Sequence, residues 1–156
     1  MEKISLNLTL AEAVKIQNAI RAGLDNVPSA EELERMVYVA NRIFEPVRHA
    51  VCGDRPLAVT SFFRSPAVNR LVGGSSNSQH CKGEAMDLDA DVYGNGGNRS
   101  IFEYIRDHLS FDQLIWEFGN DKEPAWVHVS VTSVGNRGQV LRSLRGEGGK
   151  TIYVQV

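Results

Sequence analysis

The sequence contains little cysteine and no strong excess of either charge. Only two cysteines, Cys52 and Cys81, occur in 156 residues, and they lack metal-ligand spacing, so we expect a reduced protein without a disulfide framework. The 17 lysines and arginines nearly balance the 19 aspartates and glutamates, which leaves a formal net charge of −2. No overall field therefore draws the chain to nucleic acid or to an anionic membrane, and we expect no nucleic-acid partner.

The sequence also lacks any apolar run of the ~20 residues needed to span a bilayer, so we expect no membrane span. Residues 1–6 alternate apolar and polar side chains and do not form the apolar stretch of a signal peptide. We therefore expect synthesis in the cytoplasm, with another route of delivery for any role outside it. A chain of this length fits one domain, residues 1–156, which we take to be a monomer.

Two capping boxes predict helices in the first third of the chain. Residues 9–12 open an apolar stripe that ends near Gly23, and residues 29–32 open a longer one that ends near Gly53. Pro46 lacks a backbone donor, so we expect the longer helix to kink near it. Two further helices are predicted, a short one after a turn at 64–69 and one capped by residues 100–103.

The remaining apolar segments read as strands. They occupy residues 56–63, 85–89, 113–118, 125–132 and 150–156. A short polar loop separates the third segment from the fourth, which predicts an antiparallel pair with Glu117 close to His128. The sequence therefore predicts an α+β fold, with N-terminal helices packed on a small, mainly antiparallel sheet.

A cluster of unusual residues at 78–87, SQHCKGEAMD, together with one distant histidine, predicts that the sheet carries a zinc site. Asp87 lies inside an otherwise apolar strand, where a bare carboxylate is costly unless it is paired or coordinated. His80, on the loop before that strand, and His128, within another strand, would complete a three-ligand site with an open fourth position, as in catalytic zinc centres. Asp89 lies on the same strand face and is the alternative to Asp87.

At these residues the sequence resembles the zinc D-alanyl-D-alanine carboxypeptidase family, which includes L-alanyl-D-glutamate endopeptidases of phage endolysins and shares its fold with the Hedgehog signalling domain. The resemblance runs from about residue 9 to the end and is carried by SFFRSP at 61–66, GGSSNSQHCKGEAMD at 73–87 and WVHVS at 126–130. The middle segment matches the family pattern Ser-x-His-x-x-Gly-x-Ala-x-Asp at every defined position.

The resemblance implies roles for particular residues. It implies that His80, Asp87 and His128 bind one zinc ion per chain, and that Arg64 and Ser78 face the substrate. We also expect Gln79 and Trp126 at the substrate, Trp126 as an aromatic of the pocket wall. For Arg64, the alternative is a surface ion pair worth only ~0–1 kcal/mol.

One position departs from the family pattern. Many members carry the catalytic carboxylate three residues before the last zinc histidine, where this sequence has Ala125. We expect Glu117 to replace it as the general base, because its strand is predicted to pair with that of His128, and a phage-associated branch of the family has a similar stretch. Glu123, on a loop, is the second candidate.

The resemblance implies a zinc metallopeptidase that hydrolyses amide bonds in peptidoglycan stem peptides, with Arg64 and Glu117 as catalytic residues. A phage or prophage origin would explain how an enzyme without a leader reaches the cell wall, by phage lysis or as a virion component. Two alternatives stay open: a catalytically silent zinc-bearing binding or virion-structural module of the same fold, and an intracellular D-Ala-D-Ala dipeptidase.

Overall fold

The computed structural model describes residues 2–156 and confirms the α+β class. The helices are α1 (Leu10–Ala13), α2 (Gln17–Arg21), α3 (Ala30–Val39), η1 (Ala40–Phe44, a π-helix), α4 (Glu45–Ala50), α5 (Pro66–Leu71), η2 (Gln79–Lys82, a 3-10 helix), α6 (Asn98–His108) and η3 (Glu147–Gly149, also 3-10). The strands are β1 (Lys3–Ser5), β2 (Leu8–Thr9), β3 (Ala58–Ser61), β4 (Ala85–Asp89), β5 (Gln113–Glu117), β6 (Trp126–Ser130), β7 (Gln139–Arg145) and β8 (Thr151–Gln155).

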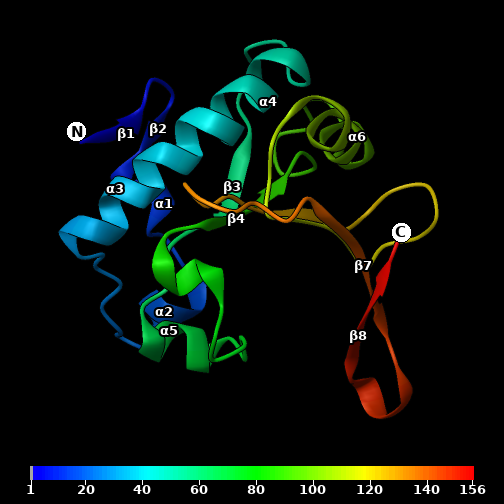
Figure 1. The fold of residues 1–156 in the computed structure, drawn as a ribbon. Helices are drawn as coiled ribbons and strands as arrows, with labels where there is room; N and C mark the ends of the chain where they lie inside the picture. Colours follow the sequence, from blue (N-terminus) through cyan, green and yellow to red (C-terminus); the bar gives the residue numbers. More distant parts are fainter. Residues whose placement is uncertain (1) are drawn as a thin grey trace.

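Six of these strands form one sheet in the order β3-β4-β6-β5-β7-β8. Every neighbouring pair is antiparallel except β5 and β7, which run parallel. The expected pairing of β5 with β6 is confirmed, and the C-terminal segment forms the edge strand β8, also as expected. β7, which was not predicted, forms a hairpin with β8 that extends away from the helices (Figure 1).

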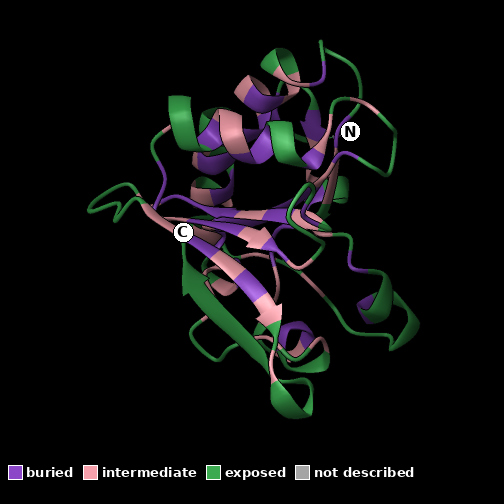
Figure 2. Ribbon diagram, turned by 90° about the vertical axis from the view of Figure 1, so that its right-hand side faces the viewer, coloured by how far each residue is buried: buried purple, intermediate pink, exposed green. Residues whose placement is uncertain are grey.

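The two faces of this sheet have opposite characters, because side chains alternate along each strand. Met86, Leu88, Val127, Val129 and Leu114 point to one face and are fully buried. They share one hydrophobic core with apolar side chains of α3, η1, α4 and α6. Figure 2 shows this buried layer between the helices and the sheet, whereas β8, at the edge of the sheet, is exposed. The opposite face is therefore free to carry polar side chains.

The predicted first helix is wrong in one respect, since the chain forms two short helices, α1 and α2, separated at residues 14–16. Thr9 caps α1 with the expected capping box. The backbone N–H of Phe63 donates to the carbonyl of Ala13, and the side chain of Asn26 donates to the carbonyl of Val14. Both carbonyls are thus used by distant parts of the chain, and the helix does not continue through them.

The other helix predictions are nearly correct. Ser29 opens α3 with the expected capping box, and the π-helical segment η1 interrupts regular helical hydrogen bonding directly before Pro46. α6 begins at Asn98 with Gly97 as its N-cap, so the prediction that residues 100–103 cap it is wrong. The carboxylate of Glu123 accepts from the backbone N–H of Arg99 and so satisfies the first turn from outside the helix.

Within residues 2–156, none of the helices combines the length and the apolar character needed to cross a membrane.

Gly83 joins η2 to β4 and is required there for two reasons. Its φ is +73°, a left-handed conformation that disfavours any side chain, and a Cβ would lie 2.6 Å from the carbonyl oxygen of Glu32 in α3. Gly23 has a similar φ of +69° but open space around it. Gly83 thus lets the loop before β4 pack directly on the α3 backbone.

We expect Gly83→Ala to lower the free energy of unfolding by about 2–4 kcal/mol, because backbone strain and overpacking add. Gly23→Ala, the matched control, carries the strain alone and should cost about 1 kcal/mol. Urea unfolding of both variants measures the difference. Equal losses in the two variants would contradict a steric requirement at Gly83.

Candidate functional site

A cleft of about 920 Å³ lies over the polar face of the sheet. Its floor and one wall consist of side chains that point to this face from five adjacent strands, namely Asp87, Trp126, His128, Gln113, Ile115, Glu117, Gln139, Leu141, Thr151, Tyr153 and Gln155. Arg64 and the loop at 72–80 form the other wall. The strand register brings residues from these five strands to one surface.

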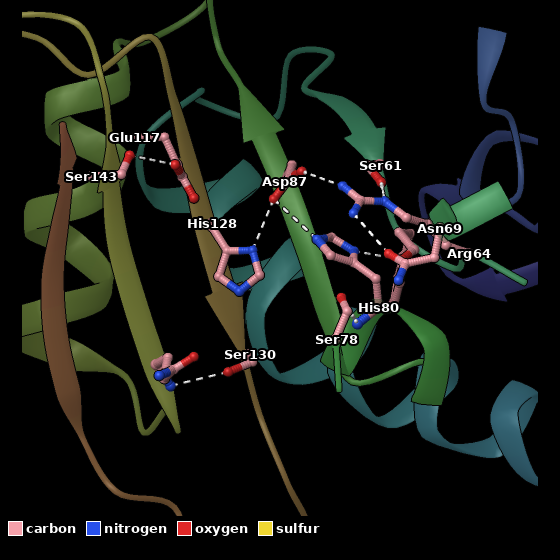
Figure 3. Close-up of polar contacts among 12 residues, drawn as sticks. Ser61, Arg64, Asn69, Ser78, His80, Asp87, Glu117, His128, Ser130 and Ser143 are labelled. Carbon is pink, nitrogen blue, oxygen red and sulfur yellow. Dashed lines mark hydrogen bonds and ion pairs between the residues drawn. The ribbon is translucent and has the colours of Figure 1, made fainter. Parts of the chain in front are cut away.

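Three side chains near the centre of the cleft could hold a metal ion: His80, Asp87 and His128. Oδ1 of Asp87 lies 3.0 Å from Nδ1 of His128 and 3.4 Å from Nε2 of His80 (Figure 3). Asp87 and His128 are directly opposite each other on β4 and β6, so their side chains share a face. The structure thus brings together the three residues that the sequence predicted as a zinc site.

The protonation states in this cluster suit a metal. Nδ1 of His80 donates to the backbone carbonyl of Phe62 at 2.7 Å, which leaves Nε2 without a proton in the neutral ring. Burial lowers the pKa of His80 and keeps this ring neutral. Burial would raise the pKa of Asp87, but its polar contacts, among them the hydrogen bond donated by Nδ1 of His128, hold this pKa well below its usual range. Two imidazole nitrogens and one ionised carboxylate form a donor set of the kind that zinc prefers.

Arg64 lies beside this cluster and not on the outer surface. Its guanidinium donates through Nε to Ser61 Oγ at 2.9 Å and contacts Oδ2 of Asp87 at 3.4 Å and Oδ1 of Asn69 at 3.4 Å. The side chain is only 16% exposed, so this is not the screened surface pair considered above. Arg64 therefore holds Oδ2 of Asp87 in place and also lines the cleft.

Ser78, Gln79 and Trp126, the residues expected at the substrate, also line the cleft. The hydroxyl of Ser78 accepts from the backbone N–H of His80 and so caps η2. The side chain of Gln79 donates to Asp112, and the ring of Trp126 packs against Phe118 at 5.5 Å between centroids. Each of the three thus has a structural contact in addition to its place at the cleft.

Glu117 lies on the same sheet face as His128, in register with Trp126 and diagonal to the histidine. It is 7% exposed, and burial raises its pKa above the usual range although a hydrogen bond from Ser143 opposes this shift. Ser143 Oγ donates to Oε2 of Glu117 at 2.6 Å and accepts from the backbone N–H of Phe118, so its one proton is directed to the carboxylate. Glu117 is thus a buried, oriented carboxylate in the cleft.

Glu123 and Asp89, the two alternative carboxylates, are used elsewhere. Glu123 binds the N-terminal turn of α6 and is not among the residues that line the cleft. Oδ1 of Asp89 accepts from the side chain of Asn98 and from the backbone N–H of Asp91. Both carboxylates therefore stabilise the loops around α6.

The sequence interpretation missed Ser61, Asn69, Ser143 and Tyr153, which contact or surround these residues. Ser61 and Asn69 flank Arg64 closely in sequence and could have been proposed as its partners from that spacing. Ser143 is 26 residues from Glu117, and no local pattern links the two. Tyr153 belongs to the predicted C-terminal strand, where alternation already separates it from Ile152 and Val154.

Comparison with known proteins agrees with the resemblance noted in the sequence. Residues 6–130 match the Peptidase M15 family. Over 64 residues the chain is 42% identical to the zinc D-Ala-D-Ala carboxypeptidase of Streptomyces albus G, a segment that covers 41% of this chain and 24% of that protein. The likeness to this relative thus spans about a quarter of its length. Because the family match covers most of the sequence and includes His80, Asp87 and His128, the chain belongs to the Peptidase M15 family.

Proposed function

We propose that this chain is a zinc-dependent peptidase that hydrolyses amide bonds in peptidoglycan stem peptides, as a D-Ala-D-Ala carboxypeptidase or an L-Ala-D-Glu endopeptidase. The observation that carries the proposal is the cluster of His80, Asp87 and His128 at the floor of an open cleft, within the residues that match the Peptidase M15 family. The similarity to a zinc D-Ala-D-Ala carboxypeptidase supports the substrate class. We further propose one catalytic domain with a Hedgehog/DD-peptidase-like arrangement of helices on the sheet.

In this proposal His80, Asp87 and His128 hold one zinc ion. When bound, zinc acts as a Lewis acid toward the scissile carbonyl and lowers the pKa of a water molecule. The contact between Arg64 and Asp87 keeps the carboxylate in place, and the exposed part of the guanidinium offers donors to a substrate oxygen. Ser78, Gln79 and Trp126 would bind the peptide on either side of the cluster.

Glu117 is the proposed general base. Its Oε2 is held by Ser143, whereas Oε1 accepts no hydrogen bond within residues 2–156 and could accept the proton that the attacking water loses. The same proton then passes to the amine nitrogen as the carbon–nitrogen bond breaks. The raised pKa of Glu117 supports this role, because a base works best when its pKa approaches the working pH.

Ala125 favours a second candidate, a binding module of the same fold that holds zinc but does not catalyse. Its methyl group replaces the carboxylate that many relatives carry at this position. Its backbone N–H donates to the backbone carbonyl of Glu117, and its carbonyl accepts from the side-chain amide of Asn98. If Glu117 does not act as base, the cleft would bind stem peptides without cleaving them.

A substrate panel tests the proposal. We expect release of D-Ala from stem pentapeptide, or cleavage after L-Ala in tetrapeptide and pentapeptide stems, detected by mass spectrometry. Whole sacculi test for an endolysin-like activity, and free D-Ala-D-Ala tests for a dipeptidase. Cleavage of the free dipeptide alone would contradict the stem-peptide proposal, and binding without cleavage of any substrate would favour the silent module.

We expect His80→Ala, Asp87→Ala and His128→Ala each to lose zinc and activity together, since each removes one of three ligands. His108→Ala, which alters an exposed residue at the end of α6, is the control and should keep about one zinc per chain. Elemental analysis of the folded proteins measures the metal. Full zinc content in all three variants would contradict the ligand assignment.

Glu117→Gln should keep zinc and the fold but reduce kcat by ~10²–10⁴-fold, because the amide retains the shape of the side chain and cannot accept the proton. Glu123→Gln is the matched control. The carboxylate of Glu123 contacts α6 and does not line the cleft, so this change should leave kcat nearly unchanged. Steady-state kinetics and zinc content should be measured for both. Nearly normal turnover in Glu117→Gln would remove it as the base.

A further inference from the structure

The far wall of the cleft is built by a part of the chain that follows the family match. That match ends at residue 130, whereas β7 and β8 begin at Gln139 and Thr151. The hairpin nevertheless supplies five residues that line the cleft: Gln139, Leu141, Thr151, Tyr153 and Gln155. The shape of the cleft on this side therefore comes from the hairpin and not from the matched residues.

The side chains of β8 do not belong to the hydrophobic core. Within the described part of the chain, residues 2–156, β8 pairs only with β7, and all five of its residues are exposed. Alternation places Thr151, Tyr153 and Gln155 toward the cleft and Ile152 and Val154 on the other face. A tyrosine at an exposed position that faces a cleft suits ligand contact, because its ring is rigid and its hydroxyl is polar.

The strand register places Tyr153 in one row with Glu117. Tyr153 is opposite Ser143, and Ser143 is opposite Glu117 on the next strand. Neighbouring strands are ~4.8 Å apart, so a tyrosine ring directed along the row extends over Ser143 toward the carboxylate. Burial, and then the charges of Glu117 and Asp87, raise the pKa of Tyr153. The phenol therefore keeps its proton at neutral pH and acts as a hydrogen-bond donor.

The hydroxyl of Tyr153 is also available. Among residues 2–156 it has no hydrogen-bond partner, and 56% of the residue is exposed. On the cleft face Tyr153 is opposite Ser143, between Thr151 and Gln155 on β8, and diagonal to Leu141 and Arg145 on β7, and the guanidinium of Arg145 lies over the ring of Phe118. Arg137, which also lines the cleft, is already paired with Asp112 at 2.8 Å. Because Glu117 lies in the same row as Tyr153, a neutral carbonyl suits the hydroxyl of Tyr153 better than a second carboxylate would.

We propose that the β7–β8 hairpin is a substrate-binding wall, in which the hydroxyl of Tyr153 donates a hydrogen bond to a backbone carbonyl of the stem peptide. This inference rests on the proposed function, because it takes the stem peptide as the ligand. It adds a direct peptide contact that the family match does not contain. Tyr153 is a binding residue here and has no part in the transfer of the proton.

Tyr153→Phe tests the contact, because it removes one hydroxyl and keeps the ring. We expect KM and the dissociation constant for a stem pentapeptide to rise about 3- to 10-fold, as for the loss of one hydrogen bond to a neutral group, with kcat within about two-fold of wild type. Tyr93→Phe is the matched control: Tyr93 is similarly exposed, at 58%, and lies outside the cleft. It should leave both constants unchanged. Binding is measured by calorimetry on the zinc-loaded Glu117→Gln background and kinetics on the wild-type background.

The outcomes separate this inference from the proposed function. Normal binding and KM in Tyr153→Phe would overturn the inference while cleavage by the wild type still supports the function. Weaker binding by Tyr153→Phe, in a protein whose wild type binds but does not cleave, would support the inference and refute the function. A lower zinc content or melting temperature, or a fall in kcat with unchanged KM, would overturn the binding role. A wild type that binds no stem peptide would overturn both.

Discussion

The site depends on one buried charge, the carboxylate of Asp87. A carboxylate inside an apolar strand loses its hydrogen bonds to water, and it stays ionised only where protein groups replace those bonds. His80 approaches it from η2, His128 from β6 and Arg64 from the segment after β3. Two of these partners are held by further contacts, His80 by the carbonyl of Phe62 and Arg64 by the side chains of Ser61 and Asn69. The arrangement of the strands around β4 is therefore also the arrangement of the proposed metal ligands.

Because side chains alternate along the strands, the two faces of the sheet have different roles. One face buries Met86, Leu88 and Val129 in the hydrophobic core that the sheet shares with the helices. The other face carries Asp87 and Glu117 in the cleft. A shift of one residue in the register of β4 or β6 would exchange the two faces, so the hydrophobic core itself enforces the geometry of the polar cluster.

Features encoded by neighbouring residues could be predicted from the sequence, and features that depend on distant pairing could not. The capping boxes at Thr9 and Ser29 were predicted correctly, and the histidine and aspartate of the pattern around Asp87 lie together with His128 as expected. The break after α1 was missed because it arises from hydrogen bonds to residues far along the chain. β7 was missed because both of its faces mix apolar and polar side chains, and it pairs in parallel with β5. Without β7 the contact between Ser143 and Glu117 could not be foreseen.

The position of each strand within the sheet also determines how readily it opens. β4 and β6 are paired on both sides and bury apolar side chains, so their amides should exchange only when the whole protein unfolds. β8 has a neighbouring strand on one side. Its Ile152 and Val154 are already 45% and 38% exposed, so detachment of β8 would expose little additional apolar surface to water. The sheet thus combines a cooperative centre with a pliable margin. Substitutions that reshape the margin would carry a small energetic penalty, and ligand preference could diverge there while the chemistry at the centre is preserved.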